Sequence, residues 1–408
     1  MSKIEVDTIA PQSGTTVTLG ESGDTITVPS GATLDTSNST VTLPDGSVSN
    51  AKLANSSITL NGNSVSLGGS ASIASGMFRN IIINGDMSIA QRGTSTSGVT
   101  TTDGYYACDR FYTQTDTGTW TISQSTDTPS GQGFSKSLKL DCTSAGTSNA
   151  DEVGIRYKVE GQNVQYLKYG TSSADSLTLS FWIKTNLTGT YTVAFKNVSS
   201  VQERIVSFEY TVSSANTWEK KTITLPGDTS QALENTNNSE FEIYWYFSAA
   251  FGTGVTNTWQ NYSSNFLSNG SLPGLGGSTD DEVYITGVQL EAGTTASDFE
   301  FLPYDVNLQR CQRYYELCDG NRVVGTSYSS TLYCNQIRFS VTKRASPTIT
   351  IQNNTTTFTV FYNGGFDASQ TWNTDTQNTD YFNINMTNTR ATGFIGPGSD
   401  LFIANSEL

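Results

Sequence analysis

The first 77 residues contain no Phe, Tyr or Trp, although the whole chain of 408 residues has 19 Phe, 19 Tyr and 6 Trp. Aromatic side chains dominate the energetics of ordinary protein cores. The segment 1–77 is instead rich in Ser, Thr, Gly and Asn, with isolated Val, Ile and Leu. We therefore divide the chain after Met77 and expect a segment without a globular core, followed by globular domains.

Aliphatic residues of the segment 1–77 come in alternating pairs, and alternation with a period of two is typical of strands. Turn residues such as those at 20–23 and 29–31 separate the pairs and keep the strands short. Ordering each residue costs about 1 to 2 kcal/mol, more than so few aliphatic side chains can offset in one copy. We predict that three copies wrap around a shared axis and form a shaft. A disordered linker is the alternative. The pairs are Val17/Leu19, Ile26/Val28, Val41/Leu43, Ile58/Leu60 and Val65/Leu67.

Composition excludes several classes of partner. The chain has 22 Lys and Arg against 37 Asp and Glu, for a net charge of −15, so phosphate backbones would repel it and we predict no nucleic-acid partner. No run approaches the roughly 18 apolar residues of a membrane span, so we predict no membrane insertion. Residues 1–10 show no signal peptide, and we expect assembly in a cytoplasm.

The absence of histidine restricts the chemistry. It removes the base of Ser-His-Asp and Cys-His systems and the commonest metal ligand. The five cysteines are scattered, without a CxxC pair, and we predict free buried thiols. They are Cys108, Cys142, Cys311, Cys318 and Cys334. We predict no catalytic residue, no metal and no cofactor, while paired-carboxylate glycosidase chemistry stays open.

Residues 78–304 alternate as half-buried strands do and predict a central antiparallel β-sandwich. Three strands carry the clearest apolar faces, which are Leu177, Leu179, Phe181 and Ile183; Val206, Phe208, Tyr210 and Val212; and Phe241, Ile243, Trp245 and Phe247.

Three rings fall out of phase with these core faces, namely Trp182, Tyr244 and Tyr246. An outward ring on a sheet can stack on a pyranose while neighbouring polar side chains bind the hydroxyls. We therefore predict glycan contact at these residues. The alternative is that the rings pack beneath a long loop or against a neighbouring subunit.

The segment 305–319 is predicted to be a linking helix. Asp305 can cap a helix that runs through Leu317, with Leu308, Cys311 and Tyr315 at spacings of three and four. On the axis of a trimer its apolar stripe would clasp the subunits.

Residues 320–408 predict a C-terminal β-sandwich that forms a tip, with strands at 337–341, 349–351 and 358–361. Loops between residues 363 and 380 carry Trp372, and Tyr381 follows them. Polar loops with a few aromatics on a β scaffold are typical of binding surfaces, so we predict receptor contact at Trp372 and Tyr381; ordinary surface loops are the alternative.

Several motifs resemble those of one family. The sequence NIIINGDMSIAQR at 80–92, DRF at 109–111 and GVQLEAGTTASDFEFLPYDVNLQRCQRYYE at 287–316 resemble the carbohydrate-binding-module-like jelly-roll domain of bacteriophage tail fibre proteins. RFSVTKRASPTITI at 338–351 and the final LFIANSEL resemble the domain that follows it. Related modules can hold a calcium ion where Asp86 and Asp281 lie, but Ser88 stands where they often carry Glu, and no metal is predicted here.

The opening SKIEVDTIAPQSGTTVTLG resembles fibres of short-tailed marine phages, especially those of cyanobacteria. The resemblance implies a homotrimeric virion component, assembled in the host cytoplasm. Its N-terminus, with Ile4, Val6 and Ile9, would dock on a tail adaptor or nozzle protein, and its β-domains would bind host surface polysaccharide or an outer-membrane receptor. A depolymerising tailspike, an architectural tail part and a secreted lectin are the alternatives.

Overall fold

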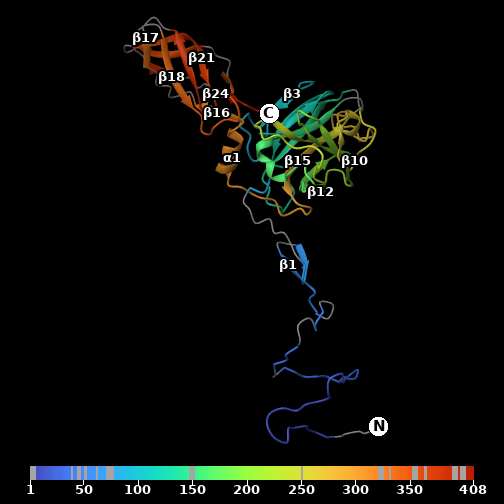
Figure 1. Ribbon diagram of the computed structural model, residues 1–408. Helices are drawn as coiled ribbons and strands as arrows, with labels where there is room; N and C mark the ends of the chain where they lie inside the picture. The colour runs from blue at the N-terminus through green and yellow to red at the C-terminus, as the bar shows by residue number, and fades with distance from the viewer. Residues whose placement is uncertain are drawn as a thin grey trace. The chain divides into compact units, whose positions relative to one another are not determined.

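The computed structural model describes the chain except residues 1–5, 38–39, 44–46, 50–52, 61–62, 70–77, 147–151, 250, 320–325, 330–331, 352–356, 363–364, 388–393 and 396–400. The chain forms two compact units, Met1–Ile73 and Ala74–Leu408, drawn in Figure 1. The boundary that we predict after Met77 falls at the end of residues 70–77, which the structure does not describe.

The described residues of the N-terminal unit contain one hairpin, β1 (Ser57–Leu60) with β2 (Asn63–Ser66), in which Ile58 pairs with Val65. Turns form where glycine and proline predicted them, with hydrogen bonds from Asp24 N to Glu21 O and from Ala32 N to Pro29 O, both 3.0 Å. The strands predicted at Val17/Leu19, Ile26/Val28 and Val41/Leu43 are not formed in the single chain, because a strand needs a partner for its backbone groups.

The central domain is an antiparallel sandwich of a seven-stranded sheet, in the order β14-β11-β10-β13-β8-β5-β4, and a six-stranded sheet, in the order β12-β9-β15-β7-β6-β3. The predicted β-sandwich is confirmed. The strands of the first sheet are β4 (Gly104–Tyr105), β5 (Tyr112–Thr115), β8 (Val153–Glu160), β10 (Gly189–Asn197), β11 (Arg204–Val212), β13 (Ser239–Ser248) and β14 (Gln260–Asn261). Those of the second are β3 (Ser95–Val99), β6 (Thr119–Ser125), β7 (Ser137–Ser144), β9 (Leu177–Thr185), β12 (Glu219–Leu225) and β15 (Glu282–Ala292). Three short 3₁₀ turns, η2 (Gly161–Asn163), η3 (Gln165–Leu167) and η4 (Ser264–Phe266), lie in the connections.

The sandwich core contains the predicted faces. The four residues predicted on β9 and the four on β13 are fully buried, and on β11 only Phe208 is partly exposed. Phe181 of β9 contacts Trp245 of β13 with ring centroids 5.9 Å apart, so the two sheets interlock through rings. Four of the cysteines are buried free thiols, as predicted; the side chain of Cys334 lies outside the described part.

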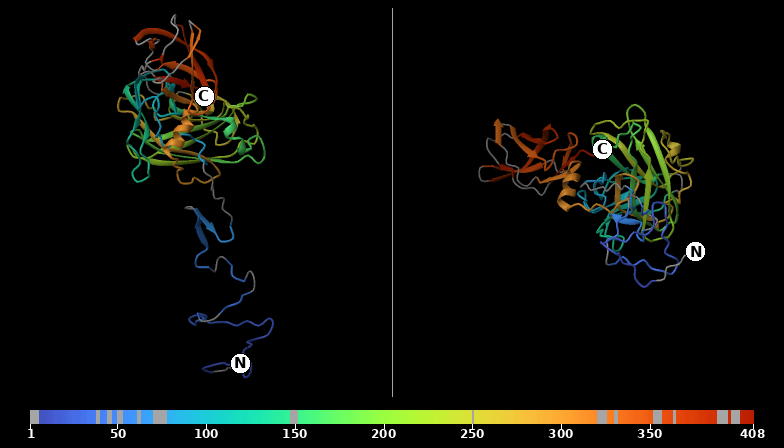
Figure 2. Two further views of the ribbon diagram at one scale, coloured as in Figure 1. Left: turned by 90° about the vertical axis from the view of Figure 1, so that its left-hand side faces the viewer. Right: turned by 60° about the horizontal axis from the view of Figure 1, so that its bottom comes forward.

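The linking helix α1 (Tyr304–Gln312) is shorter than predicted. Asp305 lies in its first turn and makes no capping bond, and Tyr315 and Leu317 belong to strand β16 (Tyr315–Asp319). β16 pairs with β24 (Leu401–Asn405), and this long-range pairing overrides the local helical spacing. The right-hand view of Figure 2 shows α1 between the C-terminal strands and the sandwich.

The C-terminal domain has two sheets, β16-β24-β19 and β17-β18-β22-β21-β20-β23. The ring of Phe382 (β22) contacts that of Phe402 (β24) at 5.4 Å, which joins the sheets. Two sequence predictions are wrong here: residues 339–341 are not in a strand, and the loop expected at 363–380 is mostly strand β21. Among the described residues, no helix has the length and apolarity that crossing a membrane requires. The remaining strands are β17 (Thr326–Ser329), β18 (Leu332–Arg338), β19 (Thr348–Ile351), β20 (Thr357–Tyr362), β21 (Gly365–Gln377), β22 (Tyr381–Thr387) and β23 (Phe394–Ile395).

Candidate functional site

Trp182 lies on the outer face of the six-stranded sheet and is half-buried. It pairs with Thr286 of β15, and the next residue, Gly287, has a φ of +61° at a register shift between Thr286 and Gln289. A Cβ atom on Gly287 would lie 2.6 Å from the ring of Phe134 and 3.0 Å from that of Trp182. The glycine therefore lets two rings approach the backbone of the sheet.

Phe134 belongs to a cluster of three rings beside Trp182. Its centroid lies 5.0 Å from that of Phe299 and 5.1 Å from that of Phe301, and the latter two are 4.8 Å apart. Phe301 is 50% exposed, whereas Phe134 and Phe299 are half-buried. The cluster presents an apolar surface at the edge of this sheet face.

Two more rings follow along the same face. Tyr284 on β15 is 7% exposed and pairs with Lys184 of β9 on one side and Lys139 of β7 on the other. The two ammonium groups lie 4.3 Å and 5.2 Å from the Tyr284 ring centroid, and the half-buried Trp218 meets the same ring at 6.1 Å. We call Phe134, Trp182, Trp218, Tyr284, Phe299 and Phe301 the aromatic face.

The charges around Trp218 and Tyr284 are paired. The Trp218 indole donates to Asp127 at 2.9 Å, and Lys184 forms an ion pair with the same carboxylate. Burial opposes ionisation of Asp127, but the bonds from Lys184 and Trp218 outweigh it and lower its pKa. The site therefore offers fixed donors and acceptors without a strong excess of either charge.

Lys139 is held in the same way. Its ammonium lies 2.9 Å from Glu282 and 3.1 Å from Asp141, and the Tyr284 hydroxyl donates to Glu282 at 2.9 Å. Burial works against the charged form of Lys139, yet its hydrogen bonds, first of all to Glu282, raise its pKa. Polar groups in defined positions thus border the rings.

Tyr244 and Tyr246 do not form an outward surface, which corrects the prediction. They stack on the outer face of the seven-stranded sheet with centroids 5.7 Å apart, but are only 6% and 1% exposed. They belong to a second apolar cluster with Leu267, Phe251 and Leu272, residues of the long connection after β13. For Tyr244 and Tyr246 the alternative interpretation therefore holds, because these rings pack beneath a long loop.

The predicted receptor residues of the C-terminal domain lie apart from this face in the sequence and the fold. Trp372 is on strand β21 opposite Met386, and its side chain lies outside the described part. Tyr381 begins β22, is half-buried, and donates its backbone N–H to Asn378 Oδ1 at 2.9 Å.

The turn that carries Tyr381 lies beside the segment that contacts helix α1. Lys343 N donates to Thr379 O at 2.7 Å, and the Lys343 ammonium donates to Gln312 O. Tyr381 is therefore near the base of the C-terminal domain instead of at a free loop tip.

Of the predicted attachment residues, Val6 and Ile9 are exposed and Ile4 lies outside the described residues. Neither Val6 nor Ile9 belongs to a buried cluster of the described residues.

The two carboxylates considered for calcium have protein partners. Asp281 accepts from Gly276 N at 2.9 Å and Ser278 N at 3.0 Å. Asp86 accepts from Ser88 Oγ at 3.0 Å and Asn307 Nδ2 at 3.1 Å. Within the described ranges, no group of three or more His, Cys, Asp or Glu side chains is placed to hold a metal ion.

Glu152 is a carboxyl group whose environment favours its protonated form. Burial, followed by the charges of Asp116 and Asp103, raises its pKa from 4.5 to about 7. Sequence reasoning missed this residue, as it missed Trp218 and Tyr284. A signal existed for Tyr284, which alternates with the core residues Val283 and Ile285.

No protein-family model matches this sequence, and a search of curated proteins found no match. The chain is similar to the enzymatically active domain of tailspike protein 4 from bacteriophage CBA120, at 13% identity and a TM-score of 0.30, over 53% of this chain and 22% of that one. The chain thus spans about a fifth of the length of that tailspike domain.

Two further solved structures are similar to the chain. A putative sugar binding protein from Bacteroides thetaiotaomicron VPI-5482 has 11% identity and a TM-score of 0.29, over 52% of this chain and 100% of that one. The N-terminal cellulose-binding domain of Cellulomonas fimi β-1,4-glucanase C has 13% identity and a TM-score of 0.25, over 51% and 100%. All three TM-scores are low.

Proposed function

We propose that this protein is a non-enzymatic adhesin, a homotrimeric bacteriophage tail fibre that binds a host surface glycan through the aromatic face. The observation that carries the proposal is a set of five partly exposed rings on one sheet face, with the buried Tyr284 in contact with Trp218, bordered by side chains whose charges are already paired. Rings in such a setting offer apolar faces to a pyranose, and the fixed donors and acceptors select its hydroxyls.

The role of a fibre is supported by the N-terminal unit. Most of its described large aliphatic side chains, from Val6 to Ile58, are between 41% and 73% exposed in the single chain. Wrapping three copies around one axis would bury them, and the resulting trimer would present three weak glycan sites at high effective concentration. Val6, Ile9 and the neighbouring Ile4 would then be available to a tail adaptor or nozzle protein, in a virion assembled in the host cytoplasm.

Glycan binding is tested on the full chain with glycan arrays and whole host cells. Phe301→Ala and Trp218→Ala should each weaken binding by about 1 to 3 kcal/mol, roughly 5- to 150-fold. Tyr166→Ala is the matched control, because Tyr166 is also 50% exposed but lies outside the aromatic face. Equal loss in the control, or no loss at Phe301 and Trp218, would exclude this face as the receptor site.

The fibre architecture is tested by light scattering on the purified full chain. A mass of about three chains is expected from a shared shaft. A monomeric mass would contradict the homotrimer. In the separate whole-cell binding assay, a protein that leaves host cells unlabelled would favour an architectural tail part.

A second function, depolymerisation of a polysaccharide, is favoured by one observation, the raised pKa of Glu152 beside Asp116 and Asp103. A neutral carboxylic acid next to a carboxylate is what glycoside hydrolysis needs. New reducing ends on incubation with host polysaccharide, absent with Glu152→Gln, would establish this activity and replace the proposal of a non-enzymatic adhesin.

A further inference from the structure

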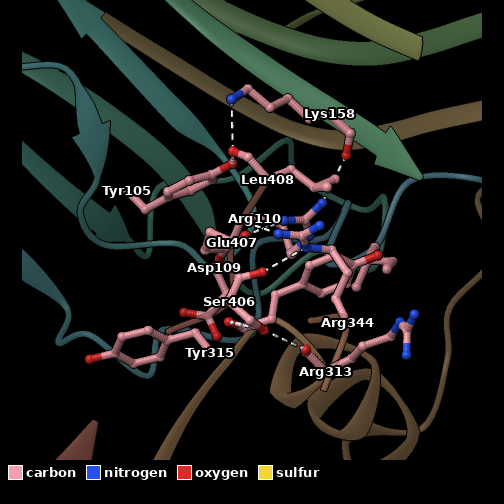
Figure 3. Close-up of polar contacts among 12 residues, drawn as sticks. Tyr105, Asp109, Arg110, Lys158, Arg313, Tyr315, Arg344, Ser406, Glu407 and Leu408 are labelled. Atoms are coloured by element: carbon pink, nitrogen blue, oxygen red, sulfur yellow. Dashed lines mark hydrogen bonds and ion pairs between the residues drawn. The ribbon is translucent and has the colours of Figure 1, made fainter. Parts of the chain in front are cut away.

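The last residues of the sequence, 406–408, follow strand β24 of the C-terminal domain and lie against the central sandwich. Figure 3 shows Glu407 and Leu408 among Arg110, Lys158 and Tyr105, which belong to the sandwich. Ser406, Glu407 and Leu408 each make a separate set of contacts.

Glu407 is held by two arginines of the sandwich. Its carboxylate lies 3.0 Å from Arg92 and forms a second ion pair with Arg110. Arg110 is 1% exposed and its guanidinium lies 3.5 Å from the centroid of Tyr314. Arg92 is similarly placed over Tyr315 at 3.7 Å. Two guanidinium groups, each lying over a tyrosine ring, thus form an anion site shaped for a carboxylate.

Leu408 has both a polar and an apolar partner. Its carbonyl oxygen accepts from the Lys158 ammonium at 2.7 Å and from the Tyr105 hydroxyl at 3.2 Å. Its side chain packs on a separate apolar cluster that contains Ile83, Ile89, Cys311 and Tyr314. The position after the acidic residue therefore requires an aliphatic side chain.

Backbone groups fix the register of the segment. Ser406 N donates to Tyr314 O at 2.8 Å, and Arg344 donates to Ser406 O at 2.8 Å and to Glu407 O at 3.1 Å. The Ser406 hydroxyl donates to Arg313 O at 3.1 Å. Main-chain bonds that set register, combined with pockets for particular side chains, are the means by which proteins recognise extended peptides.

We propose that Arg92, Arg110, Lys158 and Tyr105, with the apolar cluster around Cys311, form a peptide-recognition pocket whose ligand is the Ser-Glu-Leu segment of this chain. The pocket requires a carboxylate followed by an aliphatic residue. Occupation by the chain's own segment fastens the C-terminal β-domain to the sandwich. The proposal is independent of glycan binding, because the aromatic face contributes no residue to this pocket.

The experiment compares binding of a labelled peptide, Asn-Ser-Glu-Leu, to the full chain and to the full-length variant Glu407→Gln. The variant keeps the size of the side chain but loses the charge, so its segment should vacate the pocket. We expect the peptide to bind Glu407→Gln about 10 to 100 times more tightly than it binds the unmodified chain, as the loss of a charge-assisted hydrogen bond implies. The matched peptide Asn-Ser-Gln-Leu should bind neither protein.

Equal binding of the two peptides, or binding that survives Arg110→Met in the Glu407→Gln chain, would overturn the proposal. Hydrogen exchange on the unmodified chain covers the case in which the variants do not fold. The Ser406 amide should exchange at least about 100 times more slowly than an unstructured amide, because it donates into the pocket. Exchange at the unstructured rate would also overturn the proposal.

Discussion

The N-terminal unit and the central sandwich use the same alternating aliphatic pattern with opposite results. On β9, Leu177, Leu179 and Ile183 are fully buried. In the N-terminal unit, Val17 and Leu19 alternate in the same way but are exposed. Alternation of aliphatic residues shows that a strand has an apolar face, but it does not show which part of the protein covers that face.

The difference lies in the second layer. In the sandwich the inner face of β9 meets the other sheet through ring contacts such as Phe181 with Trp245. The described part of the N-terminal unit has one two-stranded hairpin and no second sheet, and a lone hairpin is marginal in water. Under the proposal of a fibre, further copies of the chain supply the missing layer.

The largest effect is expected from removing a ring that joins the two sheets. Phe181→Ala should lower the free energy of unfolding of the sandwich by about 3 to 5 kcal/mol, because it leaves a cavity between the sheets. Urea unfolding followed by tryptophan fluorescence measures this directly, since all six Trp lie beyond residue 77.

Leu19→Ala is the matched change in the N-terminal unit. It should leave the same fluorescence transition unchanged, because Leu19 contributes nothing to the sandwich core. A shift comparable to that of Phe181→Ala would break the contrast between the two regions.

An intermediate effect is expected at Gly287. Gly287→Ala places a methyl group against Phe134 and Trp182 on a backbone with positive φ, and should cost about 2 kcal/mol of sandwich stability. It should also weaken glycan binding, because both rings belong to the aromatic face. Gly31→Ala, at a φ of +87° with nothing within 4 Å, is the control and should leave the fluorescence transition in place.

A smaller effect is expected from the titration of Glu152. The folded protein holds this proton to about pH 7, whereas the unfolded chain releases it near 4.5. The stabilisation is therefore complete below the unfolded pKa and is lost as the pH rises through the folded pKa.

The free energy of unfolding should fall by about 2 kcal/mol from this group between about pH 5 and about pH 8, and Glu152→Gln should remove that share of the fall. Urea unfolding of both proteins at the two pH values measures it. Parallel pH profiles would show that Glu152 ionises normally in the folded state.

The sequence predicted the sandwich better than its connections. Strands β9 and β13 were predictable because alternation reports a buried face directly. The end of α1 was not, since Tyr315 and Leu317 satisfy a helical spacing and only the distant β24 makes them a strand. The same limit applies to β21, whose polar sequence looks like a loop until β20 and β22 lie on either side of it.

The candidate site was predictable only in part. Trp182 was placed on the correct outer face, but Tyr244 and Tyr246 satisfied the same rule and are buried by residues of the connection after β13. Sequence alternation cannot anticipate such a cover, because Phe251 and Leu267 lie in a stretch rich in Gly, Asn, Ser and Thr that has no alternating apolar pattern. Trp218 could not be predicted from alternation, because it lies just before strand β12. Its contact with the Tyr284 ring arises only in the folded sheet.

The smallest effect should come from two exposed aliphatic residues that differ in context. Val201 is 80% exposed in the sandwich and Leu34 is 73% exposed in the N-terminal unit. Val201→Ala should change stability by no more than about 0.5 kcal/mol, because an isolated exposed valine has no partner to lose. Leu34→Ala should instead weaken assembly of the full chain by about 1 kcal/mol per copy, if neighbouring copies bury this side chain. Light scattering over a dilution series measures the difference. Identical dissociation of the two variants would mean that neighbouring copies do not bury Leu34, so that it contributes no more to assembly than Val201 does.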